Sequence, residues 1–401
     1  MSIPESLTRD GSDVASILAA VGDLAANWGT QRDERQRRRS LDPRDFQDLR
    51  QAGVHLMAVP VELGGIWHGT RRSTRPICEI LRTLAHGDPS VALVCTMHAA
   101  VLQAFLLTRE APDPWHEAWK QQRRWAFQTV LDGAWWGTLV SEPGKANDRA
   151  RKGGTVRTNG DGSYRLTGQR HFGTGSGVTS FMITQAVPAG ESDSETFILD
   201  VRGVPWDGSA GMRLVAEWDG HGMQATQSHA FEFADFPAIR IACPEKNRVE
   251  GGLFFPAACA AVVVGVVETA LEAADQAIRG RGGALVDYER VEWTNAQLDG
   301  WLIKQAYEGM LRVVEDRDRN PSLDILRAKA SIAQLAESAL LRICRIVGAR
   351  TFNRSSPFGF WFEDVRALGF LRPSWRVAYD DLIRIGEGQP RLLELPENPR
   401  R

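Results

Sequence analysis

The 401-residue chain lacks the features of secreted, membrane-spanning and disulfide-rich proteins. It has five cysteines, and no two of them have the C-x-x-C spacing of a redox or zinc motif. The N-terminal residues contain no basic segment followed by an apolar one, so we expect no signal peptide. The longest apolar run, residues 254–267, is shorter than the ~20 residues that cross a membrane. We therefore predict a cytoplasmic protein with reduced thiols and no membrane partner.

Other absences exclude whole classes of function. The net charge of −2 gives no reason to expect nucleic acid as a partner. No H-E-x-x-H or H-x-x-x-H spacing occurs, which argues against a metal hydrolase, and we expect no metal site. The G-x-S-x-G of a serine hydrolase is also missing. The glycines of residues 173–177 follow a predicted strand but open no helix, which argues against a dinucleotide-binding loop.

The order of the predicted elements is informative. Apolar residues between Val14 and Trp28 recur at helical spacing, and residues 253–279 predict a long helix. Between these regions, Asn159–Gly162 has the composition of a hairpin turn, and residues 228–236 alternate as a strand does. The chain is therefore predicted to be an α+β protein with a helical domain (1–128), a central β-domain (129–245) and a second helical domain (246–401).

Four motifs within this order resemble those of the acyl-CoA dehydrogenase superfamily. They are Phe46–Gly65, SEPGKAND (Ser141–Asp148), LTGQRHFGTG (Leu166–Gly175) and Gly220–Ile239. The resemblance implies an N-terminal helical domain, a central β-barrel-like domain and a C-terminal four-helix bundle. It also implies a homodimer or homotetramer with a flavin between the β-domain and the C-terminal helices. Because helices 253–279 and 321–347 are apolar on more than one face, we expect them to contribute subunit contacts.

The resemblance assigns roles to six residues of the β-domain. Ser141 stands where the family has a threonine that contacts the flavin pyrimidine ring, and Phe172 stands where an aromatic residue flanks the isoalloxazine. Thr174 matches the threonine near flavin N5. The remaining implied contacts are Thr138 and Val140 at the flavin edge and Asn147 at a phosphate. The alternative is that Ser141 and Thr174 only satisfy turn backbone, as isolated Ser and Thr residues commonly do.

The C-terminal region departs from the family pattern. The elements that bind the FAD of a neighbouring subunit have the sequences RGRGGAL (279–285) and RIVGA (345–349) here. Gly348 is retained, whereas Arg345 replaces a glutamine. Arg345 is a candidate for cofactor binding because an arginine can bind phosphate. Gly348 is a candidate because it keeps the family's glycine. FAD is the expected cofactor, with FMN as the alternative.

The resemblance implies oxidation of an acyl thioester, which needs a carboxylate to remove the α-proton. Counting along the family motif from Asp364 leads near Arg372, where no glutamate occurs. Glu387, within RIGEG, matches the local sequence if an insertion precedes it. We therefore predict Glu387 as the base, the alternative being a surface carboxylate.

A second hypothesis comes from residues 355–367, which resemble the monooxygenase branch of the same superfamily. That branch uses reduced flavin from a separate reductase, acts on small molecules with O2 and needs no α-proton base. His98 is then the candidate acid or base, because histidine titrates near neutral pH. Its alternative role is packing on an apolar helix. A flavin-free scaffold of this fold is a third hypothesis, which flavin absorbance of the purified protein would test.

Overall fold

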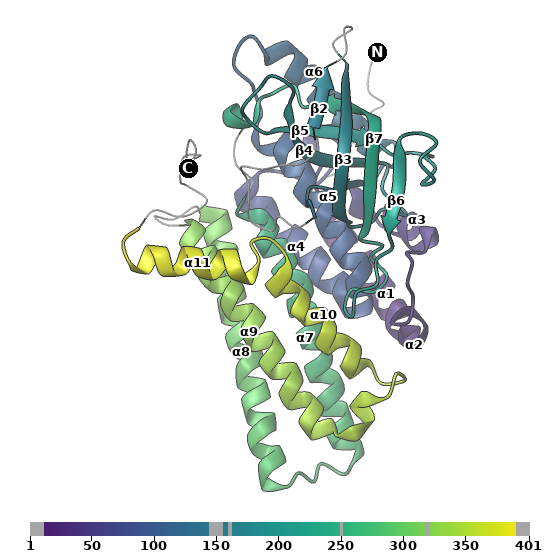
Figure 1. Ribbon diagram of the computed structural model, residues 1–401. Coiled ribbons are helices and arrows are strands. Elements are labelled where there is room, and N and C mark those ends of the chain that lie inside the picture. The colour runs from purple at the N-terminus through teal and green to yellow at the C-terminus, as the bar shows by residue number, and fades with distance from the viewer. Residues whose placement is uncertain (1–11, 144–154, 159–162, 249–251, 317–320, 390–401) are drawn as a thin grey trace.

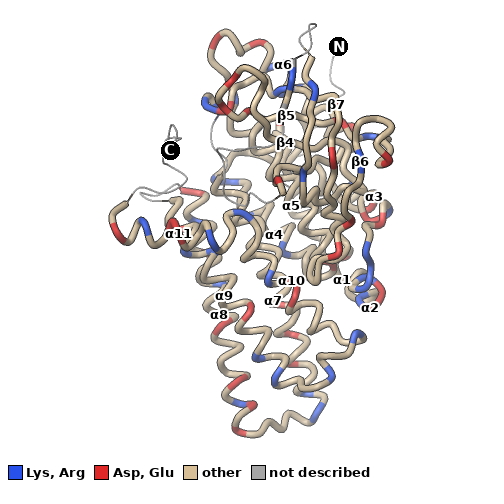
Figure 2. The backbone as a smooth tube through the Cα atoms, in the orientation of Figure 1, with Lys and Arg blue, Asp and Glu red and all other residues tan. Residues whose placement is uncertain are grey.

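The computed structural model describes residues 12–143, 155–158, 163–248, 252–316 and 321–389. Figure 1 shows the strands gathered at one end of the molecule, with the long C-terminal helices extending away from them. Figure 2 shows acidic and basic residues interspersed through both parts, in keeping with the small net charge.

The N-terminal region is helical, as predicted. Two helices begin at residues that the sequence marks: the side chain of Asp42 accepts a hydrogen bond from the Arg44 N–H, and that of Asp88 accepts from the Val91 N–H. The helices are α1 (Ser12–Thr30), α2 (Arg32–Arg35), α3 (Pro43–Gln51), η2 (Val54–Leu56), η3 (Val61–Leu63), α4 (Thr70–Gly87), α5 (Pro89–Leu107) and α6 (His116–Leu131).

The described strands form a closed ring. They are β1 (Trp136–Thr138), β2 (Thr155–Thr158), β3 (Tyr164–Gly173), β4 (Phe181–Pro188), β5 (Glu195–Asp200), β6 (Met212–Ala216) and β7 (His229–Arg240). Strands β4, β2, β3, β7 and β5 pair in that order, and β5 pairs again with β4. Strand β1 pairs with β4 and β6 with β7. The ring encloses an apolar cluster that includes Leu166, Phe197 and Phe231, so the expected barrel-like β-region is present.

Long helices follow the ring. They are η4 (Glu245–Asn247), α7 (Phe254–Gly280), α8 (Asp287–Asp316), α9 (Pro321–Val347), η5 (Ala349–Phe352), α10 (Pro357–Phe370) and α11 (Trp375–Gly386). Helices α7, α8, α9 and α10 pack against one another (Figure 1). The exact domain boundaries stay a prediction.

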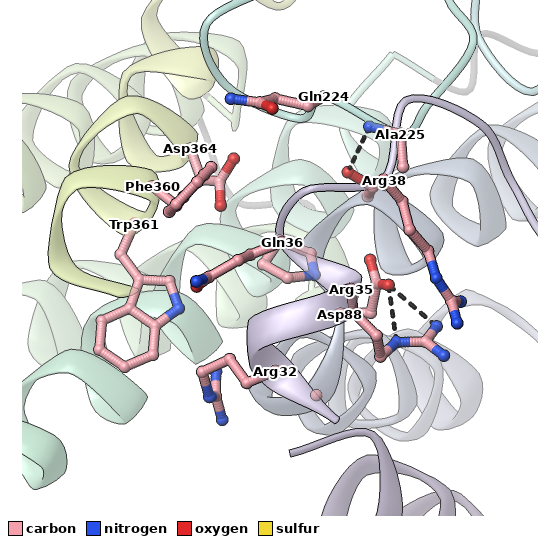
Figure 3. Close-up of a pocket in the computed structure, with 13 residues that line it drawn as sticks. Arg32, Arg35, Gln36, Arg38, Asp88, Gln224, Ala225, Phe360, Trp361 and Asp364 are labelled. Carbon is pink, nitrogen blue, oxygen red and sulfur yellow. Dashed lines mark hydrogen bonds and ion pairs between the residues drawn. The ribbon is translucent and has the colours of Figure 1, made fainter. Parts of the chain in front are cut away.

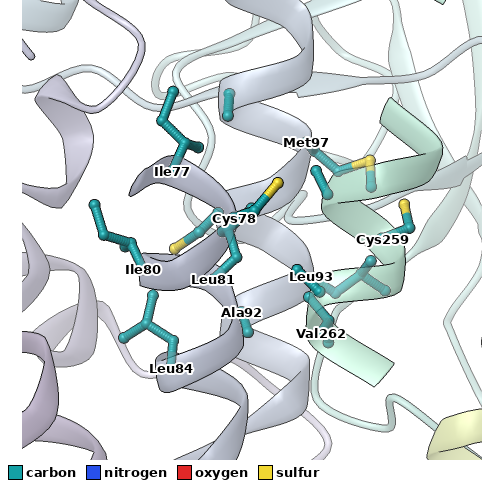
Figure 4. Close-up of a cluster of buried hydrophobic side chains, with 14 of the residues drawn as sticks. Ile77, Cys78, Ile80, Leu81, Leu84, Ala92, Leu93, Met97, Cys259 and Val262 are labelled. Carbon is teal, nitrogen blue, oxygen red and sulfur yellow. The ribbon is translucent and has the colours of Figure 1, made fainter. Parts of the chain in front are cut away.

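Helix α7 also packs against α4 and α5, and Figure 4 shows side chains from all three helices in one apolar core. A β-carbon at Gly265 would lie 2.3 Å from the Arg82 carbonyl oxygen, so the crossing of α7 over α4 requires glycine. Helices α5 and α7 are long and apolar enough to span a membrane, but 83% and 78% of their most apolar windows are buried inside the molecule. Both are core helices.

This packing does not favour α7 as a source of subunit contacts, and the oligomeric state stays a prediction. The apolar residues of α7, from Ala257 to Val267, are almost all used by the chain's own core rather than left for a second subunit. Exposed apolar side chains instead lie on α8, where Val291, Leu298, Trp301 and Leu302 are 44–59% exposed. Their spacing places them on one face of the helix. Sequence periodicity identified an apolar helix without showing which neighbours cover it.

Candidate functional site

Two neighbouring segments bring half of the predicted site residues together. The loop after β1 pairs with β3 through a bridge between Ser141 and His171, and the His171 N–H donates to the Ser141 carbonyl (2.7 Å). Just after β3, the Thr174 N–H donates to the Phe172 carbonyl (2.9 Å). The ends of β1 and β3 are therefore neighbours. At these ends or directly after them lie Thr138, Val140, Ser141, Phe172 and Thr174.

A buried arginine fixes the loop after β1. Arg170 is 0% exposed, and its guanidinium contacts Glu142 of that loop at 3.0 Å. The same group donates to the Thr184 hydroxyl (2.8 Å) and to the carbonyls of Gln169 and Gln185 (2.9 Å each). A buried charge with a partner and several acceptors holds its neighbours in one geometry. Arg170 therefore locks the loop against β3 and β4.

Phe172 has an unusual backbone and an unusual exposure. Its φ is +59°, a region that bulky residues rarely occupy, and its side chain is 55% exposed. The ring meets Trp218 edge to face, with centroids 6.1 Å apart. Met223 and Gln227 in the nearby loop also have positive φ. Backbone strain of this kind clusters at functional sites, where surrounding structure maintains it. The strand end thus presents an open aromatic face at a strained position.

The hydroxyl of Thr174 belongs to a buried chain of hydrogen bonds. It lies 2.9 Å from the Ser228 hydroxyl, which lies 2.8 Å from that of Thr226. The Thr226 hydroxyl donates to the Met223 carbonyl at 2.9 Å. The Gly175 N–H donates to the Thr226 carbonyl (2.8 Å), which joins the turn after β3 to the 223–228 segment. Thr174 is 7% exposed, so its position is firmly defined.

The 222–228 loop is also attached to α10. The Met223 N–H donates to Asp364 Oδ1 at 2.6 Å, and a β-carbon at Gly222 would lie 2.3 Å from the Glu363 carbonyl oxygen. Burial raises the pKa of Asp364 to about 7, which the Met223 hydrogen bond only partly offsets. Asp364 therefore links the C-terminal helices to the β-region.

Beside this loop lies a small cavity of about 30 Å³ (Figure 3). Asp364 and Trp361 line one side, and Arg35 and Asp88 line the other, joined by a 3.0 Å hydrogen bond. A volume of this size holds one or two waters and is far too small for an aromatic cofactor. Its buried charges are already paired, so it is a structural feature of the domain contact.

Arg372 approaches the same site from the C-terminal side. It follows α10, and its Nη2 lies 3.4 Å from the Ser141 hydroxyl. The backbone that carries it is held by Lys329, whose buried Nζ donates to the carbonyls of Leu368 (2.6 Å), Leu371 (3.0 Å) and Pro373 (2.7 Å). Burial lowers the pKa of Lys329 to about 8. Arg372, near which counting along the family motif ends, thus brings a guanidinium to Ser141.

Glu387 lies elsewhere. It follows α11, is exposed, and accepts a hydrogen bond from the Gln389 side chain (3.1 Å). The 12 residues of α11 separate it from Arg372, a length of ~18 Å at 1.5 Å per residue. This position does not favour the predicted role as catalytic base.

His98 is placed as a packing residue. It is 0% exposed, its Nε2 lies 2.8 Å from the His55 carbonyl oxygen, and its Nδ1 accepts from the Trp136 N–H (3.0 Å). Burial lowers the pKa of His98 to about 3. A neutral imidazole with both nitrogens bound to backbone is poorly suited to proton transfer, so the geometry favours the packing alternative.

The remaining predicted residues lie apart from this site. Arg345 is at the end of α9, where its Nη1 lies 3.4 Å from Glu292 Oε2, and Gly348 follows with φ +82°. Asn147 lies outside the described residues. The roles of these three residues in binding a cofactor stay predictions.

Sequence reasoning missed the residues that support the site. Arg170 follows Leu166 at the inward spacing of strand β3, and a charge at an inward position was the available signal. Lys329 and Ser228 gave no comparable signal, because their partners lie far along the chain.

The arrangement fits a flat aromatic cofactor. Phe172 offers an exposed ring, Ser141 and Thr174 offer hydroxyls beside it, and main-chain groups of the two strand ends lie between them. Such sites combine apolar cover with a few fixed polar groups. The strand side of the predicted flavin site therefore has the components that a flavin ring needs.

Comparison with known proteins supports this assignment. No protein-family model matches the chain. It is 25% identical over 352 residues to the amino sugar nitrososynthase DnmZ of Streptomyces peucetius, covering 82% of each chain. It is 26% identical to the dibenzothiophene monooxygenase of Rhodococcus qingshengii, covering 68% of this chain and 64% of the relative. The structure of KijD3 with FMN and a dTDP-linked amino sugar superposes with a TM-score of 0.79 at 18% identity, over 96% of this chain and 98% of that one.

The chain has the fold of the acyl-CoA dehydrogenase superfamily, and the relatives and solved structures that it resembles are flavin-dependent oxidising enzymes. The resemblance that the four motifs indicated is thereby confirmed. The relatives named above are nitrososynthases and monooxygenases, so the similarity favours the monooxygenase hypothesis over acyl-thioester dehydrogenation.

Proposed function

We propose that this protein is a flavin monooxygenase that uses reduced FMN and O2 to oxygenate a small molecule. The observation that carries the proposal is the guanidinium of Arg372 beside Ser141, near the residue at which counting along the family motif would put the dehydrogenase base. Arginine remains protonated in proteins and cannot remove an α-proton at neutral pH. A monooxygenase needs no such base, so this arginine leaves its chemistry intact.

The relatives support the same choice. DnmZ is named a nitrososynthase and the Rhodococcus protein a monooxygenase, and the superposed KijD3 structure contains FMN. FMN in place of FAD also agrees with the departure of residues 279–285 and 345–349 from the FAD-binding pattern. FMN lacks the adenylate that those elements hold in the family.

When bound, reduced FMN would supply the electrons with which O2 is activated. Phe172 would cover one side of the ring, while Ser141 and Thr174 would hold its polar edge. Arg170 keeps the Ser141 loop rigid by its contact with Glu142. Arg372 offers N–H donors at the Ser141 edge, where they can orient a polar or anionic group of the substrate.

The decisive experiment compares two reactions of the FMN-loaded protein. For a monooxygenase, we expect no anaerobic bleaching of oxidised FMN by a panel of acyl-CoAs. With reduced FMN and isotope-labelled O2, we expect the label in the sulfoxide or sulfone of dibenzothiophene or in an oxidised dTDP-linked amino sugar, the two probe substrates. Bleaching by any acyl-CoA would restore the dehydrogenase hypothesis, and failure to bind either flavin would reject both.

We propose a second copy of this chain and a separate flavin reductase as partners. The α8 face of Val291, Leu298, Trp301 and Leu302 is 44–59% exposed per side chain and suits a symmetric apolar contact. Light scattering should show a dimer or tetramer that the double substitution of Leu298 and Trp301 by Glu converts to monomer. The same oligomer in wild type and variant would place the contact elsewhere. The cytoplasmic location stays a prediction.

A further inference from the structure

The hydroxyl chain behind Thr174 has a direction. At its inner end the Thr226 hydroxyl donates to the Met223 carbonyl, which is an acceptor only. That carbonyl also accepts from the Trp218 indole N–H (2.9 Å) and, at the longer distance of 3.2 Å, from the Thr226 backbone N–H. Because the proton of Thr226 is used there, the Ser228 hydroxyl must donate to Thr226. The Thr174 hydroxyl must then donate to Ser228.

This direction leaves Thr174 with only lone pairs for an outside partner. The opposite direction would leave the oxygens of Thr226 and the Met223 carbonyl 2.9 Å apart without a proton between them. All three hydroxyl-bearing residues are at least 90% buried, so water does not readily replace the lost bond. This series of hydrogen-bonded hydroxyls cannot relay protons onward, since it ends at a carbonyl that has no proton to give.

We propose that Ser228 and Thr226 are positioning residues that fix the Thr174 hydroxyl as an acceptor toward bound flavin and so favour the reduced cofactor. The inference rests on the proposed function and on the family resemblance, which matches Thr174 to the threonine near flavin N5. That nitrogen carries a hydrogen in reduced flavin and a lone pair in oxidised flavin. An acceptor therefore gains a hydrogen bond with the reduced form and faces a lone pair in the oxidised form. An enzyme that takes up reduced flavin from a reductase benefits from this preference.

The test measures binding rather than turnover. Dissociation constants of the purified protein for oxidised and for reduced FMN are determined anaerobically, and their ratio is compared among variants. Ser228→Ala frees the Thr174 proton, so we expect the preference for reduced FMN to fall about 3- to 10-fold, as the loss of one hydrogen bond predicts. Thr226→Val should lower the ratio in the same direction, because Ser228 then has no fixed acceptor.

Ser176→Ala is the matched control. Ser176 lies in the same turn, but its hydroxyl donates to the Gly173 carbonyl and takes no part in the chain. We expect its ratio to equal that of the wild type. An unchanged ratio in Ser228→Ala, with FMN still bound and the circular dichroism spectrum retained, would overturn the inference alone. A wild-type protein that binds FMN in neither redox state would instead reject the proposed function.

Discussion

The strand side and the helix side of the proposed flavin site differ in how far they keep the superfamily pattern. On the strand side, Ser141, Phe172 and Thr174 occupy adjacent strand ends, and a fully buried Arg170 holds the neighbouring loop. On the helix side, the guanidinium of Arg372 contacts Ser141, and the predicted base Glu387 lies beyond α11. The cofactor face is retained while the acid–base group has changed.

This difference separates two tasks that a dehydrogenase combines. Holding a flavin ring needs rigid backbone and a few fixed polar groups, which the strand ring supplies through long-range pairing. Removing an α-proton needs a carboxylate at one point, which a single substitution can delete. The protein is therefore expected to bind flavin through its strands and to take its reaction type from its C-terminal helices.

The largest expected effect is on the strand side, from Arg170→Met. Removing this guanidinium deletes the buried ion pair with Glu142 and the hydrogen bonds to the carbonyls of Gln169 and Gln185. Breaking a buried ion pair typically costs about 3–5 kcal/mol of the free energy of unfolding. We expect that loss in urea unfolding, together with at least tenfold weaker FMN binding, because the Ser141 loop is released.

Arg157→Met is the control for this variant. Arg157 lies in the same strand ring, but its ion pair with Asp235 is exposed, with side chains 61% and 55% accessible. An exposed pair contributes at most about 1 kcal/mol. If both variants lose similar stability and FMN affinity, Arg170 has no special role in the loop.

On the helix side, Lys329→Met should reduce stability with little effect on cofactor binding. The change leaves the carbonyls of Leu368, Leu371 and Pro373 without their buried donor, at a cost of about 2–3 kcal/mol. FMN affinity should change less than about threefold, since hydrogen bonds on the strand side hold the ring. Lys304→Met, at an exposed lysine, is the matched control. A loss of FMN affinity as large as that of Arg170→Met would contradict the division between the two sides.

The contact between the two sides should depend on pH through Asp364. Its pKa in the folded protein is about 7, well above its usual value of 3.8, because of burial. The folded state therefore binds the proton more tightly than the unfolded state, and stability falls as pH rises from about 4 to about 7. Asp364→Asn keeps an acceptor for the Met223 N–H and removes this cost.

We expect Asp364→Asn to be more stable than the wild type by about 1–2 kcal/mol at pH 8 and equally stable at pH 4, measured by urea unfolding. Asp364 is partly exposed, so solvent screens part of the cost of its charge. Glu363→Gln, at the adjacent carboxylate, should give no such difference. A variant that loses stability at pH 8 would show that the charged carboxylate is needed for the Met223 contact.

The sequence predicted the elements better than the contacts between them. The alternation of residues 228–236 is a local signal, and strand β7 (His229–Arg240) confirms it, whereas the predicted turn at Asn159–Gly162 lies outside the described residues. Burial was not predictable in the same way. The packing of His98 and the coverage of α7 depend on residues far along the chain, as does the partnership of Lys329 with the α10 terminus.

The smallest expected effect belongs to Glu387→Gln. Glu387 is exposed, follows α11 and lies ~18 Å along that helix from the residue that contacts Ser141. Removing a true general base lowers the rate by about 10²–10⁴-fold. Removing a surface carboxylate should change the rate of substrate oxygenation by less than about twofold, which corresponds to ~0.4 kcal/mol. The variant is assayed beside Arg372→Gln, which removes the charge at Ser141 and should weaken binding of an anionic substrate while keeping FMN bound. A collapse of activity in Glu387→Gln with an unaffected Arg372→Gln would reverse the comparison and return the catalytic carboxylate to the helix side.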